Sequence, residues 1–394
     1  MRTKLEYAVL RPLIREHGED GCDEDRDRRG YRKGDHVRQD RRHCRDRRQN
    51  GETVYSHAAG YADRETQKAT DTRTIFRLAS VTKPLVAAAA LALVDKGRLA
   101  LSDRARDYLP YFRPRQPDGE IADITIQHLL THTAGLGYGA DPKTTPPERM
   151  FNAGLADTDL DFEENFTRLS TFPLLAAPGK LWSYSIAIDV LGAVIARIEA
   201  CSLEEAVRLH VTGPLGMSDT GFSVSDPERL ATPYADAAPT AVRMSDRHLV
   251  PDDSGNPLTF APTRLFNPKA FQSGGAGMVG TAPDLITFLE AIRGGGAPIL
   301  KAETARAALL NQIGDIPRPG KPGEGFSFLG AVIRDPILAE VPMAKGSVSW
   351  GGVYGHSWFI DPLEGISAAI MSNTAVEGCM GAFPRDIVRA IYGV

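Results

Sequence analysis

The sequence of 394 residues lacks the features that mark several common classes of protein. It has only four cysteines, widely spaced, with no C-x-x-C pair and no zinc-ligand spacing, so we expect free thiols and no metal site. No apolar run is long enough to cross a bilayer, and the longest, residues 85–94, ends at Asp95 and Lys96. These absences argue against a disulfide-stapled, zinc-binding or membrane-spanning protein.

A surplus of positive charge is also absent. The chain has 46 Lys and Arg against 50 Asp and Glu, a formal net charge of -4, which argues against a nucleic-acid or anionic-membrane partner. Residues 1–10 include Glu6 and lack the apolar core of a secretory signal, so the predicted location is the cytoplasm. The sequence gives no indication of the oligomeric state.

The first 50 residues do not follow a folded pattern. Residues 15–48 are dense in Arg, Asp and Glu, with too few apolar side chains to offset the entropy of ordering the backbone. Asn50-Gly51 is a strong hairpin-turn signal, yet the segment before it does not alternate as a partner for the strand at 53–60 should. We therefore predict that residues 1–50 are a charged tract, disordered or aberrant. We hypothesise that a reading-frame error upstream of Gln49 removed the partner strand.

The rest of the chain has strand patterns at its two ends and helical patterns in the middle. The segments FSFLGAVIRD, GSVSWGG, GHSWFIDP and GISAAIMSNT indicate a meander of strands near the C-terminus. This order predicts an α/β (α+β) fold, in which helices flank an antiparallel sheet built from the two chain ends and a mostly helical lobe is inserted. We assign residues 51–99 and 270–394 to the sheet domain and residues 100–269 to the helical lobe.

The segment RLASVTKPLVAAAALALVDKGRL, residues 77–99, sets Ser80 and Lys83 at the head of an apolar helix. Positions i and i+3 share a helix face, so the hydroxyl and the amine should lie within reach of each other. The free N–H groups and the dipole of a helix N-terminus stabilise an alkoxide or a developing oxyanion. The alternative is that Ser80 is an ordinary N-cap and Lys83 a surface lysine, because S-x-x-K also arises by chance.

Two further segments contain candidates for proton relay and oxyanion binding. Tyr184 precedes an amphipathic helix, where a phenol near two cations can act as base and then as acid, although it could equally be a core-edge aromatic. Trp350-Gly351-Gly352 lies in a predicted strand, where glycines admit close approach of a substrate and expose an N–H, unless they mark an edge bulge. No G-x-S-x-G is present, which argues against an α/β-hydrolase nucleophile elbow.

Together these segments resemble a known family. Ser80-Val81-Thr82-Lys83, Tyr184-Ser185 and Trp350-Gly351-Gly352 followed by His356 are similar to the three motifs of the serine β-lactamase and penicillin-binding-protein superfamily. The form is that of the EstB-like, family VIII carboxylesterases. The resemblance continues between the motifs, over residues 52–394, and implies a β-lactamase-like fold and a serine hydrolase without a cofactor.

The resemblance also implies residue roles. Ser80 would be the acylated nucleophile, Lys83 its proton acceptor or electrostatic partner, and Tyr184 the base that activates Ser80 and protonates the leaving alcohol. The backbone N–H of Ser80 and one from the strand at 350–353, which includes Gly351, Gly352 and Val353, would form the oxyanion hole. Trp350 would border the substrate. For His356 two readings stay open, substrate contact or packing under the strand.

Two departures from the family pattern bear on the substrate. Ile186 stands where penicillin-processing relatives have Asn, and Trp350-Gly351-Gly352 stands where they have Lys-Thr-Gly or a close variant. Because both changes remove groups that would hold a β-lactam, the expected function is a carboxylesterase acting on small, short-chain esters. The alternatives are a β-lactamase or D-peptidase, an acyltransferase using the same residues, or a catalytically weak binding homologue. His128 and His132, four apart, have no evident third ligand and do not predict a metal site.

Overall fold

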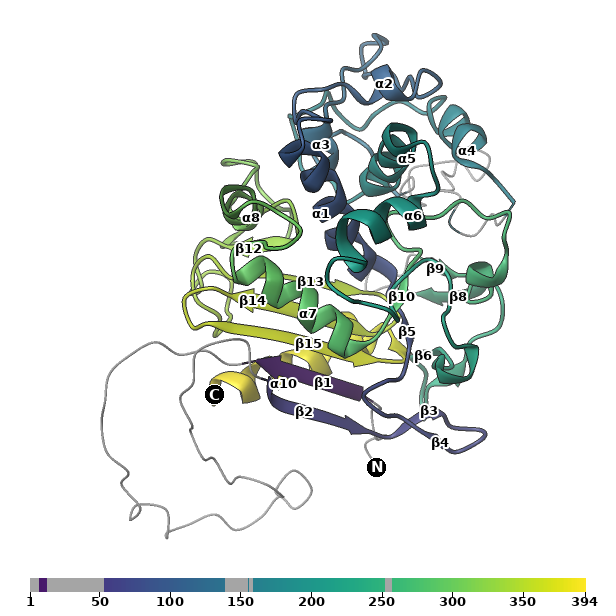
Figure 1. Ribbon diagram of the computed structural model, residues 1–394, viewed down its shortest axis with the longest axis vertical. Coiled ribbons are helices and arrows are strands. Elements are labelled where there is room, and N and C mark those ends of the chain that lie inside the picture. The colour runs from purple at the N-terminus through teal and green to yellow at the C-terminus, as the bar shows by residue number, and fades with distance from the viewer. Residues whose placement is uncertain (1–6, 13–52, 139–154, 156–158, 252–256) are drawn as a thin grey trace.

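A seven-stranded antiparallel sheet forms the base of the computed structural model, which describes residues 7–12, 53–138, 155, 159–251 and 257–394. The strand order β11-β12-β13-β14-β15-β1-β2 places the two ends of the chain side by side in one sheet (Figure 1). The strands, in that order, are Glu324–Phe326, Ala331–Ile333, Val348–Gly352, His356–Asp361, Ile366–Ser372, Tyr7–Pro12 and Thr53–Ala59. The predicted antiparallel sheet from both chain ends is therefore confirmed.

Strand β1 departs from the sequence-based expectation. It lies between β15 and β2, with Val9 opposite Ile370 on one side and His57 on the other. The prediction that residues 1–50 contain no partner for β2 is therefore wrong. The six residues of β1, beside a charged tract, are too few to show a strand pattern in the sequence. In the structure they provide partners for the backbone N–H and C=O groups of β15 and β2, which need such partners in the sheet. Residues 13–52, with the predicted turn at Asn50-Gly51, lie outside the described residues.

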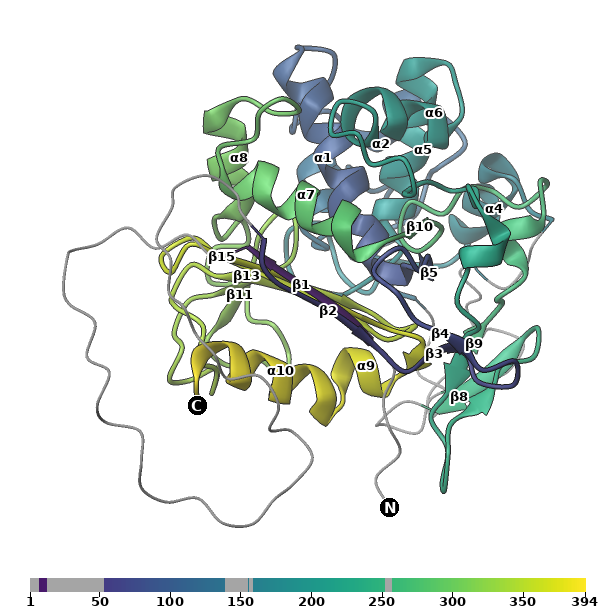
Figure 2. The same ribbon diagram turned by 60° about the horizontal axis from the view of Figure 1, so that its bottom comes forward.

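Helices cover both faces of this sheet. Figure 2 shows α1 and α7 on one side and α9 and α10 on the other. All seven residues of β15 are buried, as expected for a central strand that is covered on both faces. These helices are Thr82–Asp95, Ala282–Arg293, Glu377–Met380 and Ala382–Tyr392.

The inserted lobe packs around two apolar helices, α1 and α5 (Ala187–Glu199). Twelve of the fourteen residues of α1 are buried, so this helix runs through the core and has no solvent face. Helix α1 contacts α5, and the small side chains of its alanines allow neighbouring elements to pack closely against it. The N-terminus of α1 is thereby fixed at the junction between lobe and sheet, close to β13.

The remaining elements are short. The helices are α2 Ala105–Tyr108, α3 Ile126–Leu130, α4 Phe162–Leu169, α6 Leu203–Val207 and α8 Ala302–Leu309, with 3-10 turns η1 Ala79–Val81, η4 Pro227–Arg229 and η5 Arg264–Phe266 and a π-helical turn η3 Arg208–Thr212. The strands are β3 Tyr61–Asp63, β4 Lys68–Ala69, β5 Phe76–Arg77, β6 Tyr234–Ala235, β7 Val242–Arg243, β8 His248–Pro251, β9 Pro257–Phe260, β10 Val279–Gly280 and β16 Thr374–Ala375. Of the helices that the structure describes, none is long and apolar enough to span a bilayer.

Candidate active site

Ser80 lies in the 3-10 turn η1, directly before α1, and Lys83 lies in the first turn of that helix. Lys83 Nζ donates a hydrogen bond of 3.1 Å to Ser80 Oγ. Ser80 is partly exposed whereas Lys83 is only 4% exposed, so the Lys83 amine contacts the Ser80 hydroxyl from the buried side. The structure therefore brings together the two residues that the S-x-x-K spacing predicts to be neighbours.

The backbone at this turn adopts an uncommon conformation. Ala79, immediately before Ser80, has a φ of 44°, in the left-handed region that non-glycine residues rarely adopt. Neighbouring bonds hold it there: Leu78 N–H donates to the Met278 carbonyl at 2.9 Å, and Met278 N–H donates to Thr82 Oγ1 at 3.1 Å. Strained backbone persists only where the surroundings determine it, and such positions cluster at functional sites.

Lys83 is held from the opposite side by a tight turn. Its Nζ donates to the Gly275 carbonyl at 2.7 Å and lies 4.7 Å from the ring centre of Tyr184. Asp189 of α5 is buried beside this turn and accepts a hydrogen bond from the Ser273 hydroxyl. A Cβ added to Gly275 would lie 2.3 Å from Asp189 Oδ2, so the turn can approach the carboxylate only with glycine at this position.

Asp189 was not among the predicted site residues. Burial raises the pKa of its carboxyl, while the nearby charge of Lys83 and the Ser273 hydrogen bond lower it. One of its oxygens has no hydrogen-bond partner among the described residues. The sequence contained a signal for it, because Asp189 is the one acid within the apolar run AIDVLGAVI. A buried acid in such a run needs a partner, and here the partners come from the 273–275 turn and from α1.

Tyr184 stands within a cluster of aromatic rings. Trp350 Nε1 donates to Tyr184 Oη at 3.4 Å, and the two ring centres are 5.1 Å apart. Trp182 stacks against Tyr184 at an interplanar angle of 17°, and the Tyr138 ring centre lies 5.3 Å away. We call the following six residues the aromatic cluster: Tyr138, Trp182, Tyr184, Phe326, Trp350 and His132. The phenol and indole that were predicted separately are thus in contact beside Lys83.

His132 contributes a neutral ring to this cluster. Its Nδ1 accepts the Ser185 backbone N–H at 3.2 Å, and its ring centre is 4.9 Å from that of Tyr184. Burial, together with the positive charges of Lys83 and Arg318, holds the pKa of His132 well below its usual value. His128, by contrast, caps α3, where its Nδ1 accepts the Thr125 backbone N–H. In the part of the chain that the structure describes, no group of three His, Cys, Asp or Glu residues could hold a metal.

The glycines of β13 pack closely against their surroundings. A Cβ added to Gly352 would lie 2.2 Å from the Leu78 carbonyl oxygen, so this strand presses directly against the turn that carries Ser80. A Cβ added to Gly351 would lie 2.7 Å from Cys379 Sγ, beside α9. Val353 packs with Tyr354 against a small separate core cluster. The strand thus approaches η1 at Gly352, as an oxyanion site requires.

His356 lies beneath the strand. Its side chain is 1% exposed, its Nε2 is 2.8 Å from the Arg77 carbonyl, and its ring meets Phe76 edge-on at 5.6 Å. Burial lowers the pKa of His356 to about 4, so the neutral ring donates its Nε2 proton to that carbonyl. The geometry supports the packing alternative, in which His356 ties β14 to β5, since it leaves no surface for substrate.

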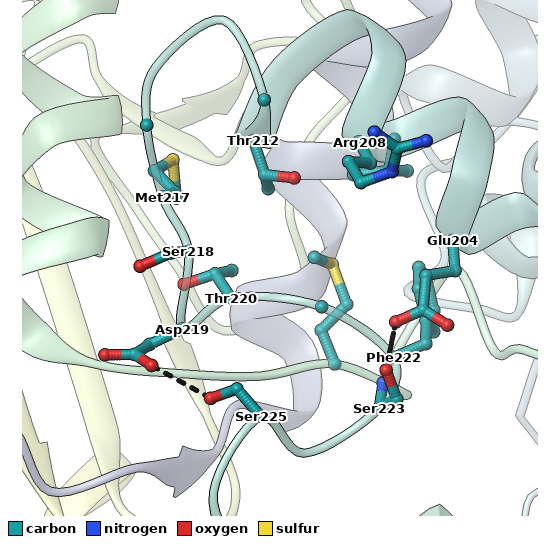
Figure 3. Close-up of a pocket in the computed structure, with 15 residues that line it drawn as sticks. Glu204, Arg208, Thr212, Met217, Ser218, Asp219, Thr220, Phe222, Ser223 and Ser225 are labelled. Carbon is teal, nitrogen blue, oxygen red and sulfur yellow. Dashed lines mark hydrogen bonds between the residues drawn. The ribbon is translucent and has the colours of Figure 1, made fainter.

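A separate cavity lies between α6, η3 and residues 216–225 (Figure 3). Its volume is about 340 Å³, and Met278, whose backbone bonds to Leu78 and Thr82, reaches into its lining. The acids that line it are already paired, Glu204 with Ser223 and Asp219 with Ser225 (Figure 3). None of the predicted catalytic residues faces this cavity.

Comparison with known protein families finds a match over most of the chain. The Beta-lactamase family model matches residues 48–387. The chain belongs to the beta-lactamase family. Within the family it is 46% identical over 346 residues to Esterase EstB of Burkholderia gladioli, covering 87% of this chain and 88% of that protein. It is 25% identical to Acyltransferase calJ of Penicillium decumbens, over 85% of this chain and 86% of that one.

The fold comparison gives the same result. The solved structure of EstCE1, described as a hydrolase with promiscuous acyltransferase activity, matches with a TM-score of 0.84 and 36% identity. The match covers 99% of this chain and 94% of that one. The predicted β-lactamase-like fold is confirmed.

Proposed function

We propose that this member of the beta-lactamase family is a serine carboxylesterase that hydrolyses short-chain esters through an acyl-enzyme on Ser80. The observation that carries the proposal is the contact of 3.1 Å between Lys83 Nζ and Ser80 Oγ, with the same Nζ 4.7 Å from the ring centre of Tyr184. Nucleophilic catalysis by serine needs a neighbouring group that takes its proton, and this arrangement supplies two candidates. Kinship to Esterase EstB across most of the chain supports the same reaction class.

The residues have distinct roles in the proposed reaction. Tyr184, as a phenolate with the Lys83 ammonium beside it, takes the proton of the Ser80 hydroxyl as Oγ attacks the ester carbonyl carbon. The negative charge that develops on the carbonyl oxygen is stabilised by the backbone N–H of Ser80 and by an N–H of the strand at 350–353. The ester C–O bond then breaks and the leaving alcohol takes the proton from Tyr184. Water, activated in the same way, releases the carboxylic acid and restores Ser80.

The surroundings favour esters over β-lactams. Ile186, at the position of the Asn of penicillin-processing relatives, is completely buried at the start of α5 and offers no amide to a substrate. Trp350 likewise places an indole where those relatives have a lysine, and that indole is engaged with Tyr184. A site without the groups that bind a lactam amide or carboxylate discriminates against lactams by the loss of those interactions.

The test is hydrolysis of p-nitrophenyl acetate, p-nitrophenyl butyrate and a chromogenic cephalosporin by the wild type and by Ser80→Ala. The proposal predicts butyrate and acetate cleavage that is lost in the variant, and much weaker cephalosporin cleavage. Cephalosporin turnover as efficient as ester turnover would instead assign a β-lactamase. Absence of turnover by the folded wild type, with no acyl adduct in its intact mass, would favour a binding homologue.

A second candidate activity is acyl transfer to an alcohol. It is favoured by the likeness to EstCE1, a hydrolase with promiscuous acyltransferase activity, and to Acyltransferase calJ. The same acyl-serine would be attacked by an alcohol in place of water. Butyl ester formed from vinyl butyrate and butanol, measured by gas chromatography, distinguishes transfer from hydrolysis.

Two further statements belong to the proposal. We assign residues 51–99 and 270–394 to a sheet domain and residues 100–269 to a helical lobe, which is supported by the strands at 53–59 and 324–372. We also propose a cytoplasmic location, supported by the unpaired thiols of Cys201 and Cys379.

A further inference from the structure

Arg318 is a buried arginine that contacts the aromatic cluster. Arg318 follows α8, and its side chain is only 5% exposed, although arginine is rarely buried without a specific partner. It forms an ion pair with Glu324 of β11. Among the described residues this is the sole hydrogen-bonded partner of the guanidinium, and Nε has none.

The faces of the guanidinium are covered by aromatic rings. Its central carbon lies 4.6 Å from the ring centre of Trp182, 5.4 Å from that of Trp350 and 5.6 Å from that of Phe326. Cations placed over aromatic rings within about 6 Å are attracted by the ring electrons, most strongly by those of tryptophan. Arg318 therefore connects three rings that come from separate parts of the chain.

Two of those rings also contact Tyr184. Trp350 donates a hydrogen bond to Tyr184 Oη at 3.4 Å, and Trp182 stacks against the Tyr184 ring. Phe326 meets Trp350 at 88° and thereby limits how far that indole can tilt. A chain of contacts thus runs from Glu324 through Arg318 and the two indoles to Tyr184, the proposed base.

Stability alone does not account for this arrangement. A buried ion pair often contributes no more to stability than apolar residues of the same size would, because both charges must leave water. Arg318 is also unsuited to hold a substrate anion, because Nε is fully buried, a second nitrogen is engaged by Glu324 and the rings cover its faces. Its remaining effect is on the rings that it contacts.

We propose that Arg318, held in place by Glu324, is a positioning residue that fixes Trp182 and Trp350 and through them the hydroxyl of Tyr184. The inference rests on the proposed function, because it assigns Tyr184 a catalytic role. Displacement of a catalytic group by about 1 Å can cost about 100-fold in rate, so small tilts of the two indoles matter.

The test uses Arg318→Met combined with Glu324→Gln, because the single change at Arg318 would leave the partly buried carboxylate of Glu324 unpaired. For p-nitrophenyl butyrate we expect kcat to fall at least about ten-fold while KM stays within about two-fold, the pattern for a group that acts in the transition state alone. Glu324→Gln alone keeps an amide oxygen that accepts from the guanidinium and leaves the guanidinium on the rings, so kcat should fall less than in the double variant. Arg318→Lys keeps the positive charge but not the planar guanidinium, so its kcat should lie between those of the double variant and of Glu324→Gln.

The chain offers a matched control. Arg64, after β3, lies 4.2 Å from the ring centre of Tyr234 and forms an ion pair with Glu65, so it repeats the arginine, ring and acid arrangement away from the aromatic cluster. Arg64→Met should leave kcat unchanged. Equal losses of kcat in this control and in the double variant would overturn the inference, because both losses would then reflect general destabilisation.

A spectroscopic readout separates this inference from the proposed function. The chain has three tryptophans, Trp182, Trp350 and Trp358, and Trp358 is buried in the core. The double variant should therefore change the tryptophan bands in the near-ultraviolet circular dichroism of the folded protein, and Arg64→Met, which removes a contact with the Tyr234 ring, should leave those bands unchanged. If the wild type hydrolyses no ester, the proposed function fails while this spectral change still supports the positioning of the indoles. An unchanged spectrum, or a folded double variant with kcat within two-fold of the wild type, overturns the inference.

Discussion

Replacement of Gly352 by alanine tests the contact between the sheet and the turn that carries Ser80. The added methyl group would lie 2.2 Å from the Leu78 carbonyl oxygen and 3.2 Å from Val81 Cγ2. Ordinary contacts of a Cβ begin at 3.4 Å, so the strand and the turn must separate by more than 1 Å at this point. Because Leu78 is followed closely by Ser80, that movement widens the proposed oxyanion site between Ser80 and β13.

The expected size of the effect follows from the loss of one donor. Removal of one oxyanion-hole hydrogen bond costs roughly 100-fold to 1000-fold in kcat, about 2.7 to 4 kcal/mol. Overpacking should lower the free energy of unfolding by about 1 to 3 kcal/mol, too little to unfold a protein of ordinary stability. The loss of rate should therefore appear in a folded protein.

The assay is steady-state hydrolysis of p-nitrophenyl butyrate, with urea unfolding measured on the same samples. Gly213→Ala is the matched control, since its added Cβ would lie 2.5 Å from the backbone oxygen of Arg208, at the end of η3 and away from Ser80. We expect the control to lose stability but to keep kcat. A folded Gly352→Ala variant with kcat within three-fold of the wild type would refute the reasoning.

Three other predictions follow from buried groups. Burial lowers the pKa of His356 from 6.5 to about 4, so as the pH falls this histidine is protonated in the unfolded chain before it is protonated in the folded protein. The free energy of unfolding should therefore be highest above pH 6.5 and should decline by up to roughly 3 kcal/mol between pH 6.5 and 4. Urea unfolding at pH 7.5 and 4.5 should show a smaller decline for His356→Gln, and an equal decline would contradict the assignment. Asp189→Asn removes the carboxylate near Lys83 and should lower kcat roughly ten-fold, equivalent to about 1.4 kcal/mol; unchanged kcat would show that this charge is not used. Tyr184→Phe keeps the ring contacts but should lower kcat about 100-fold to 10000-fold, and a loss below ten-fold in single-turnover hydrolysis would exclude the phenol as the base.

The part of the site that could be predicted from the sequence is the part that depends on local geometry. Ser80 and Lys83 are neighbours because they are three apart at the start of a helix, and the chain itself enforces this. Tyr184 and Trp350 were predicted from segments with motif character, and their contact with each other supports that reading. The sheet followed from short apolar segments separated by turn residues near the C-terminus, which form β13, β14 and β15.

The residues that were missed act through contacts between distant parts of the chain. Asp189 matters because the turn at Gly275 approaches it, and the sequence separation hides that approach. Arg318 contacts the rings of Trp182 and Trp350, which are far from it along the chain, so no spacing rule could connect them. Strand β1 was missed for a different reason: its six residues beside the charged tract are too few to show a strand pattern, although they pair with β15 in the sheet.

The central claim, that Ser80 is the acylated nucleophile, is tested most directly by covalent labelling. The wild type is treated with a fluorophosphonate probe, digested and mapped by tandem mass spectrometry, beside Ser80→Ala treated in the same way. We expect one modified residue, Ser80, and no label on the variant. A label on any other side chain, or equal labelling of the variant, would contradict it.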